Sequence, residues 1–150
     1  MKELGIYIHI PFCSSKCYYC DFVSFSGLDK RVDEYIYYLL LEMDIYKELL
    51  KEYTVKTIFI GGGTPSYINE SYIERILKHI YENFNVEGVQ EITIEANPGT
   101  INREKLILYK EMGINRISMG VQTLNEKLLN IKGRRHTVLD FYKNYEMRKI

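Results

Sequence analysis

The stretch Gly5-Ile-Tyr-Ile-His-Ile-Pro-Phe-Cys-Ser-Ser-Lys-Cys-Tyr-Tyr-Cys20 joins a short strand to a cysteine-rich loop, and it determines our interpretation of the fold. Three isoleucines alternate with Tyr7 and His9 over residues 5–10, so the two sets face opposite sides of a sheet. The alternation ends at a proline, and we predict a long loop over residues 11–27. A strand followed directly by a chemically distinctive loop is typical of α/β proteins.

Outward from this stretch, short β-like runs alternate with longer helical runs. Further strands are predicted at residues 56–60, 91–95 and 116–120. Helices are predicted at about 29–53, from 69 or 71 to 84, at 103–112, at 126–131, and from about 138 onward. This is a βα unit repeated four times, which in one sheet requires parallel strands joined by right-handed crossovers.

Two architectures fit an α/β chain of this kind. One is an open doubly wound sheet, and the other is the first half of a (β/α) barrel, whose full form takes roughly 250 residues. In both, the loops at the carboxyl ends of the strands build the functional site. Those loops hold residues 13–20, 61–66, 95–99 and 120–122, so we expect the unusual residues to gather at one rim.

Composition and charge exclude several classes of protein. A chain of 150 residues is long enough for one domain. Its composition, 46% hydrophobic and 27% charged residues, is ordinary for a globular protein. No apolar run approaches the roughly 18 residues of a membrane span, and no secretory signal is recognisable, so a cytoplasmic location is expected. Twenty basic and twenty acidic residues cancel, which gives no electrostatic case for nucleic acid.

The chemistry is expected at Cys13, Cys17 and Cys20, a C-x3-C-x2-C spacing. A zinc site would need a fourth ligand, and the nearest candidate, His9, lies on a strand that extends away from the loop. Three unrelated buried cysteines would need apolar surroundings, but residues 14–16 are polar. A [4Fe–4S] cluster fits better, because three thiolates leave one iron open for a substrate.

This cysteine spacing after a first strand resembles the signature of the radical S-adenosylmethionine enzymes. Residues 7–13, 61–66, 95–100 and 116–122 are further similar to the oxygen-independent coproporphyrinogen III oxidase-like group of that superfamily. The resemblance implies a [4Fe–4S] cluster on the three cysteines and S-adenosylmethionine, whose amino and carboxylate groups chelate the open iron. It also implies reductive cleavage of the cofactor to a 5′-deoxyadenosyl radical.

The same resemblance implies a set of cofactor contacts but names no catalytic residue. The implied contacts with S-adenosylmethionine are Tyr7, Tyr19, Gly62, Gly63, Thr64, Glu95, Gln122 and Arg134. Two plainer interpretations stay open at this point. The glycine run could be only a tight turn, and Glu95 could be only a solvated strand end.

Phe22 bears on which branch of the group this chain belongs to. In the oxidases of the group that this chain resembles, the cysteine pattern is C-x3-C-x2-C-x-C. Here Phe22 occupies the position of the last cysteine. The ending Cys20-Asp-Phe22 instead resembles the haem chaperones of the group, which bind haem and S-adenosylmethionine and deliver haem to apo-proteins. We favour the chaperone interpretation, with an oxidase or an inactive truncation as alternatives. The implied partners are haem or porphyrinogen, a haem-accepting apo-protein and an electron donor.

The length leads to an expectation about domains. Members of the group have a longer barrel and a carboxyl-terminal domain, whereas this chain stops after four βα units with no turn or cap at residues 148–150. Residues 1–150 are therefore expected to be the amino-terminal part of a radical S-adenosylmethionine core, with the haem contacts in the absent remainder.

Overall fold

The computed structural model describes residues 2–147 as an α/β fold, so the chain end at residues 148–150 lies outside the described residues. Four parallel strands form the main sheet in the order β1-β4-β5-β6. Their bounds are β1 (Lys2–Ile10), β4 (Tyr53–Gly62), β5 (Glu91–Ala96) and β6 (Arg116–Met119). The predicted parallel sheet is confirmed.

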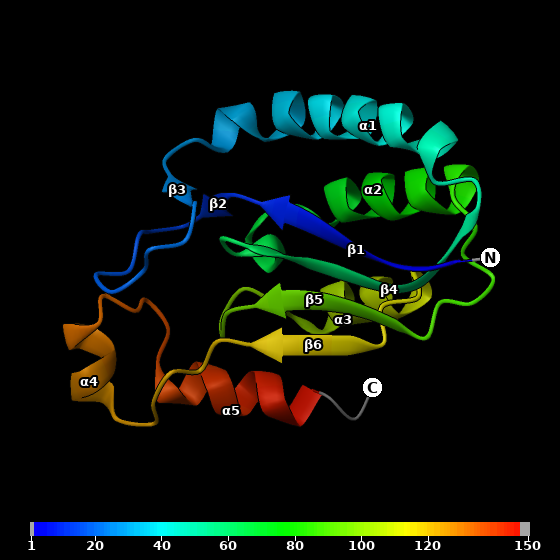
Figure 1. Ribbon diagram of the computed structural model, residues 1–150. Helices are drawn as coiled ribbons and strands as arrows, with labels where there is room; N and C mark the ends of the chain where they lie inside the picture. Colours follow the sequence, from blue (N-terminus) through cyan, green and yellow to red (C-terminus); the bar gives the residue numbers. More distant parts are fainter. Residues whose placement is uncertain (1, 148–150) are drawn as a thin grey trace.

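The order of the strands distinguishes between the two predicted architectures. A doubly wound sheet reverses its strand order at a switch point, whereas these strands neighbour each other in chain order, as in a barrel. The helices form one layer, since α1 (Val32–Leu49) packs against α2 (Glu70–Asn83) and α2 against α3 (Arg103–Glu111). Figure 1 shows α1 and α2 side by side along β1 and β4. The fold is therefore part of a (β/α) barrel.

The core lies between the sheet and this helix layer. The strands contribute alternate isoleucines that are at most 3% exposed, namely Ile8, Ile10, Ile58, Ile60 and Ile94. The helix α2 contributes one stripe at helical spacing, Ile73, Ile76, Leu77 and Ile80. Burying each such side chain contributes about 1.5–3 kcal/mol to the stability of the fold. The packing of the strands against α2 therefore determines which face of each strand turns away from the helices.

The face turned away from the helices carries the polar side chains. In the register of the sheet, His9 pairs with Gly61, and Glu95 pairs with Ser118. These residues form one row close to the carboxyl ends of the strands. Because a strand alternates its side chains, burying the isoleucines on one side commits this row to the other.

The structure corrects some predicted boundaries. The first helix was expected over residues 29–53, but a 3-10 turn, η1 (Asp29–Arg31), precedes α1, and Tyr53 already belongs to β4. The reason is that Tyr53 pairs with Lys2, so β4 is extended by its ladder with the edge strand β1. Two short strands, β2 (Phe12–Cys13) and β3 (Phe25–Ser26), lie inside the expected loop.

The remaining elements complete the rim. A 3-10 turn, η2 (Pro65–Tyr67), follows the glycine run, and α4 (Glu126–Ile131) and α5 (Val138–Glu146) begin where the sequence predicts them. In Figure 1, α4 lies at the end toward which the strands point, below the segment that holds the cysteines. Across residues 2–147, none of the helices has the length and apolar character of a membrane span.

Candidate functional site

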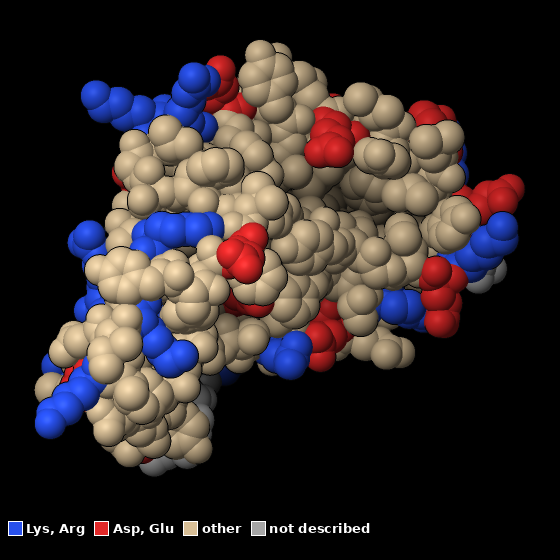
Figure 2. All heavy atoms as spheres, turned by 60° about the vertical axis from the view of Figure 1, so that its left-hand side comes forward, with Lys and Arg blue, Asp and Glu red and all other residues tan. Residues whose placement is uncertain are grey.

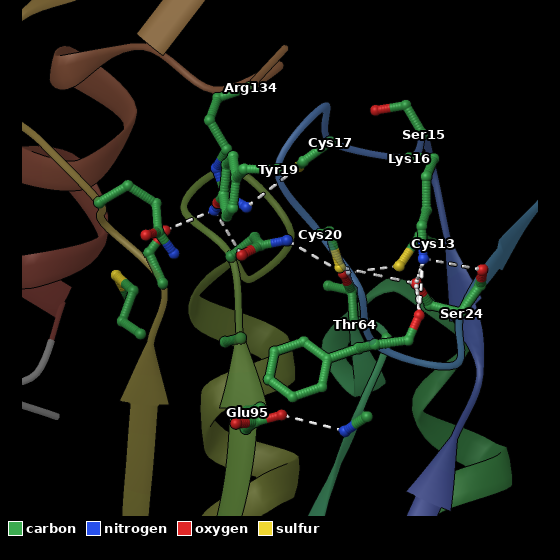
Figure 3. A pocket seen from close by; sticks show the side chains of 18 of the residues that line it. Cys13, Ser15, Lys16, Cys17, Tyr19, Cys20, Ser24, Thr64, Glu95 and Arg134 are labelled. Atoms are coloured by element: carbon green, nitrogen blue, oxygen red, sulfur yellow. Dashed lines mark hydrogen bonds between the residues drawn. The ribbon is translucent and has the colours of Figure 1, made fainter. Parts of the chain in front are cut away.

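The carboxyl ends of the strands surround a pocket of about 300 Å³. Figure 2 turns this end forward and shows basic and acidic groups scattered over a largely uncharged surface. The pocket is lined by all of the residues predicted for the site except Tyr7, namely Cys13, Cys17, Tyr19, Cys20, Gly62, Gly63, Thr64, Glu95, Gln122 and Arg134. Figure 3 shows the cysteines, Thr64, Glu95 and Arg134 around this space. The expected gathering at one rim is confirmed.

The cysteine loop, residues 13–20, is closed at its base by the pairing of β2 with β3. Inside this closure, the Lys16 ammonium donates to the Phe22 carbonyl at 2.6 Å and to the Ser24 hydroxyl at 2.8 Å. Ser24 is buried, and its hydroxyl lies 3.9 Å from the Cys20 sulfur. Lys16 thus ties the start of the loop to the segment that follows it, a role that sequence reasoning missed.

A segment far away in the sequence holds the other side of the cysteine loop. The Tyr18 amide donates to the Lys132 carbonyl at 3.2 Å, and the Lys132 ammonium lies 4.9 Å from the centre of the Tyr19 ring. Arg134 donates through Nη1 to the Cys17 sulfur at 3.6 Å. We call residues 132–134 the clamp, because they bind the loop through backbone, ring and thiol together.

The three thiols are free and half-buried. Thr64 donates its hydroxyl to the Cys13 sulfur at 3.5 Å, as Arg134 donates to the Cys17 sulfur. Donors directed at sulfur stabilise the thiolate, which is the form that binds metal. Across residues 2–147, no three His, Cys, Asp or Glu side chains are grouped as a single metal ion would require. The donor set of three soft sulfurs lining a pocket fits an iron–sulfur cluster with one iron left open.

The glycine loop, residues 61–66, lies directly against the cysteine loop. The Gly63 amide donates to the Ile10 carbonyl at 2.8 Å, and the Thr64 amide donates to the Phe12 carbonyl at 2.9 Å. A Cβ on Gly63 would lie 2.8 Å from that Phe12 oxygen and 3.0 Å from the Cys13 sulfur. The loop is therefore more than a turn, because its lack of side chains permits contact between two backbones beside a thiol.

Glu95 closes the opposite wall of the pocket. Its Oε2 accepts a hydrogen bond from the Gly62 amide at 3.0 Å, and its side chain is half-buried. A Cβ on Gly61 would lie 2.8 Å from the same oxygen. The carboxylate therefore orders the glycine loop and leaves its other oxygen for a ligand with a positive charge or donor groups.

Tyr7 is the predicted site residue that the structure places outside the pocket. Its ring stacks on Phe59 with centroids 6.0 Å apart, and its hydroxyl lies 3.0 Å from His9 Nδ1. His9 Nε2 lies 2.7 Å from the Val23 carbonyl, which can only accept, so Nε2 donates to it while Nδ1 forms the hydrogen bond with Tyr7. Burial and then the charge of Glu95 raise the pKa of Tyr7. Tyr7 thus supports the end of the cysteine-bearing segment from outside.

Tyr19 and Gln122 also line the pocket. Burial is the main cause that raises the pKa of Tyr19, so its ring stays an uncharged wall beside Cys17 and Cys20. Gln122 has φ +66°, the only positive φ of a non-glycine residue between residues 2 and 147. Such a conformation is uncommon for a residue with a side chain, and residues held in it cluster at functional sites.

Several further residues line the same pocket although the sequence analysis assigned them no contact with the cluster or S-adenosylmethionine. They are Ser15, Lys16, Phe22, Ser24, Ala96, Asn97, Ser118, Met119 and Gly120. One of them had a usable signal, since Asn97 is the first residue after β5, at the carboxyl end of a central strand. Ala96, Ser118 and Met119 end the strands β5 and β6, whereas the remaining residues depend on which way the loops turn, which periodicity does not reveal.

Comparison with known proteins places these features in a family. The model of the Radical SAM superfamily matches residues 7–149. The heme chaperone HemW of Lactococcus lactis is 43% identical over 148 residues, which is 99% of this chain and 38% of that protein. The oxygen-independent coproporphyrinogen-III oxidase-like protein HemZ of Bacillus subtilis is 38% identical over 151 residues, 97% of this chain and 30% of that protein.

Solved structures agree with the sequence relatives. Coproporphyrinogen III oxidase HemN of Escherichia coli superposes with a TM-score of 0.91 and 32% identity, over 99% of this chain and 35% of that chain. Elp3 of Methanocaldococcus infernus, with a TM-score of 0.52 and 16% identity, shares the fold alone. The chain spans about a third of the length of the curated relatives it matches.

Proposed function

Because this chain belongs to the radical SAM superfamily, we propose that its pocket holds a [4Fe–4S] cluster and S-adenosylmethionine side by side. The cluster ligands in this proposal are Cys13, Cys17 and Cys20. The observation that carries it is that three free thiols share one pocket with the glycine loop and Glu95. The family implies both groups, and the residues present suit both.

The chain's own residues have distinct tasks in this proposal. The backbone of the glycine loop and the carboxylate of Glu95 bind the amino end of S-adenosylmethionine, Tyr19 covers the cluster, and Gln122 and Arg134 complete the pocket. Together, the bound groups supply one-electron cleavage of a carbon–sulfur bond. The half-buried walls limit access of water to that bond.

We further propose that the protein acts as a haem chaperone. Two findings support this. The chain is 43% identical to a protein named heme chaperone HemW, and it has Phe22 at the position where the oxidase pattern has a further cysteine. The exposed apolar side chains of Tyr18, Phe22 and Val23 beside the pocket suit a flat apolar ligand or a protein that receives it. The proposed partners are haem, a haem-accepting apo-protein and an electron donor, in a cytoplasm that keeps the thiols reduced.

A radical coproporphyrinogen oxidase is the second candidate. The TM-score of 0.91 to the Escherichia coli enzyme favours it, because the two proteins share this part of the fold closely. Fold alone does not decide the reaction, so the two candidates must be separated by their ligands.

Anaerobic reconstitution with iron and sulfide tests the cluster site. We expect about four irons and four sulfides per chain, the content of one cubane cluster, with a brown absorbance. The matched control is the triple variant with Cys13, Cys17 and Cys20 each changed to Ser, which should stay colourless. Uptake of zinc without sulfide by the unmodified chain would contradict the proposal.

Titration with haem separates the chaperone from the oxidase. The reconstituted chain and the Lactococcus lactis relative are titrated side by side; the haem absorbance of the longer relative should shift, and a shift with the chain itself would show that part of the haem site lies within its 150 residues. In parallel, both are incubated with coproporphyrinogen III, a reductant and S-adenosylmethionine. Decarboxylated product would contradict the chaperone proposal and favour the oxidase.

A further inference from the structure

A chain of hydrogen bonds links the sulfurs of two proposed cluster ligands across the pocket. Arg134 donates through Nη1 to the Cys17 sulfur at 3.6 Å and through Nη2 to Asn97 Oδ1 at 2.6 Å. Asn97 Nδ2 donates to Thr64 Oγ1 at 3.0 Å, and this hydroxyl donates to the Cys13 sulfur at 3.5 Å. Figure 3 shows Arg134 on one side of this chain and Thr64 with Cys13 on the other.

Two donors in this chain, Arg134 Nη1 and Thr64 Oγ1, donate directly to a sulfur, and the other two connect them through Asn97. The Thr64 hydroxyl has one proton, which it gives to Cys13, so it must accept from the Asn97 amide. The Asn97 amide therefore has a fixed orientation, with its oxygen toward the Arg134 cation and its nitrogen toward Thr64. Hydrogen bonds in series polarise one another, so the positive charge of Arg134 acts on Cys17 directly and on Cys13 through Asn97.

The packing around Asn97 holds its carboxamide in this position. A Cβ on Gly120 would lie 2.8 Å from Asn97 Oδ1, so the glycine provides the space that the carboxamide occupies. The Thr100 hydroxyl donates to the Asn97 carbonyl at 2.7 Å and fixes the turn. That hydroxyl in turn lies 2.5 Å from the Ser66 hydroxyl, which connects the turn to the glycine loop.

The guanidinium of Arg134 is already committed to this arrangement. Besides Cys17 and Asn97, its Nη2 donates to the Gly120 carbonyl. Its Nε is buried without a hydrogen-bond partner among residues 2–147. Releasing Asn97 would therefore free one donor group and leave the cation less firmly held.

We propose that Asn97 is a positioning residue for the cluster. Its carboxamide holds one donor on each of two ligand sulfurs, and so raises the reduction potential of the bound cluster. Hydrogen bonds to sulfur stabilise the more negative, reduced state, and they are a recognised determinant of cluster potentials. This inference rests on the proposed cluster site.

The test is the substitution Asn97→Ala in the chain after anaerobic reconstitution, with the potential measured by EPR-monitored redox titration. At a fixed ambient potential near the midpoint, we expect the ratio of reduced to oxidised cluster to fall about three- to ten-fold. A ten-fold fall is about 59 mV for one electron. Iron and sulfide content should stay at the level of the unmodified chain, because all three cysteines remain.

The matched control is Asn115→Ala. Asn115 also makes two side-chain hydrogen bonds, accepting from the Ile92 amide at 2.9 Å and donating to the Gln90 carbonyl at 2.9 Å. It precedes β6, at the opposite end of the sheet from the cysteines. Asn115→Ala therefore removes as many side-chain hydrogen bonds within the protein as Asn97→Ala does. The control should show any general destabilisation of the fold while leaving the reduction potential of the cluster unchanged.

A second variant keeps the test decisive if Asn97→Ala does not load a cluster. Asn97→Leu fills a similar volume, removes both the acceptor for Arg134 and the donor to Thr64 and adds no charge, so a lower potential again supports the inference. A potential equal to that of the unmodified chain, or a shift matched by Asn115→Ala, overturns it. Failure of the unmodified chain to load any cluster overturns the proposed function itself, and this inference with it.

Discussion

Gly63 lies where two loops meet, with the Phe12 carbonyl and the Cys13 sulfur too close for a side chain. The Phe12 backbone and the Cys13 sulfur cannot move away without disturbing the cysteine loop. Gly63→Ala should therefore overpack the contact between the two loops. We expect it to lower the free energy of unfolding by about 1–3 kcal/mol and to reduce iron loading. Urea denaturation of the apo-protein and iron analysis after reconstitution measure the two effects.

The control for Gly63→Ala is Gly88→Ala. There the nearest atom to a new Cβ is the flexible Lys56 ammonium, at 2.6 Å, which can swing away. This variant should unfold within about 0.5 kcal/mol of the unmodified chain and load iron normally. Equal losses in both variants would show that the junction with the cysteine loop is not special.

Glu95→Gln separates two tasks of one carboxylate. An amide oxygen can still accept the Gly62 hydrogen bond, so stability and cluster loading should change little. Loss of the charge should weaken binding of S-adenosylmethionine about ten- to a hundred-fold, on the order of 1.5–3 kcal/mol. Equilibrium dialysis with the reconstituted variant measures this, and unchanged affinity would remove Glu95 from the proposed site.

At the scale of elements, α5 depends on its amino-terminal cap. Thr137 Oγ1 accepts from the Asp140 amide at 3.1 Å, and Asp140 Oδ2 accepts from the Thr137 amide and hydroxyl, each at 2.8 Å. Further along α5, Asn144 accepts from the Gly99 amide at 2.7 Å and donates to the Ile101 carbonyl at 2.9 Å. The cap therefore steadies the turn after β5, which carries a wall of the pocket.

This cap gives the stability of the fold a pH dependence. Hydrogen bonds from Thr137 lower the pKa of Asp140 below its ordinary 3.8. A lowered folded-state pKa means that the contribution is complete above the unfolded value and is lost as pH falls through the folded value. Thr137→Val should cost about 1 kcal/mol near neutral pH and distinctly less near pH 2, by urea denaturation. An equal cost at both pH values would contradict this account.

The same elements show what sequence could and could not reveal. The starts of α4 and α5 were predicted correctly, and the structure shows that Asn125 and Thr137 cap them through side-chain contacts within three residues, which are local in sequence. The extent of β4 was missed because Tyr53 joins the strand through pairing with β1, a contact that no local pattern encodes. Predicted boundaries failed where partners are distant in sequence.

For the candidate site too, the sequence predicted some features and could not reveal others. Residues at the carboxyl ends of strands were predicted to gather at one rim, and topology alone brings Cys13 and Glu95 to one pocket. Topology could not show that Tyr7 turns toward His9 outside the pocket, or that Arg134 points at Cys17. The first depends on how the Tyr7 ring packs against Phe59 of β4, and the second joins segments 117 positions apart in the sequence.

At the scale of the whole molecule, the pocket lies at an open end of the barrel segment. Half-buried ligands and an accessible iron should make the cluster sensitive to oxygen, so we expect its brown absorbance to fade in air. Added S-adenosylmethionine should slow the fading, because it occupies the open iron. Timed spectra with and without S-adenosylmethionine measure the protection, and equal rates would argue against chelation at the cluster.

The Glu95→Gln variant is the control for that protection. Its cluster should fade at the unmodified rate without S-adenosylmethionine and should gain less protection at the same concentration. Equal protection in both proteins would mean that the cofactor shields the cluster without the contact assigned to this carboxylate.

The clamp also constrains how this protein is made. Arg134 reaches Cys17 across 117 positions of sequence, so a growing chain exposes its cysteines long before the residues that secure them exist. At about 5–20 residues per second, that interval is on the order of 6–23 seconds on the ribosome. During it, the thiols are open to oxidants and stray metals. We therefore expect iron and sulfide to load best after the clamp has emerged, and a slowed ribosome to lower the yield of loaded protein.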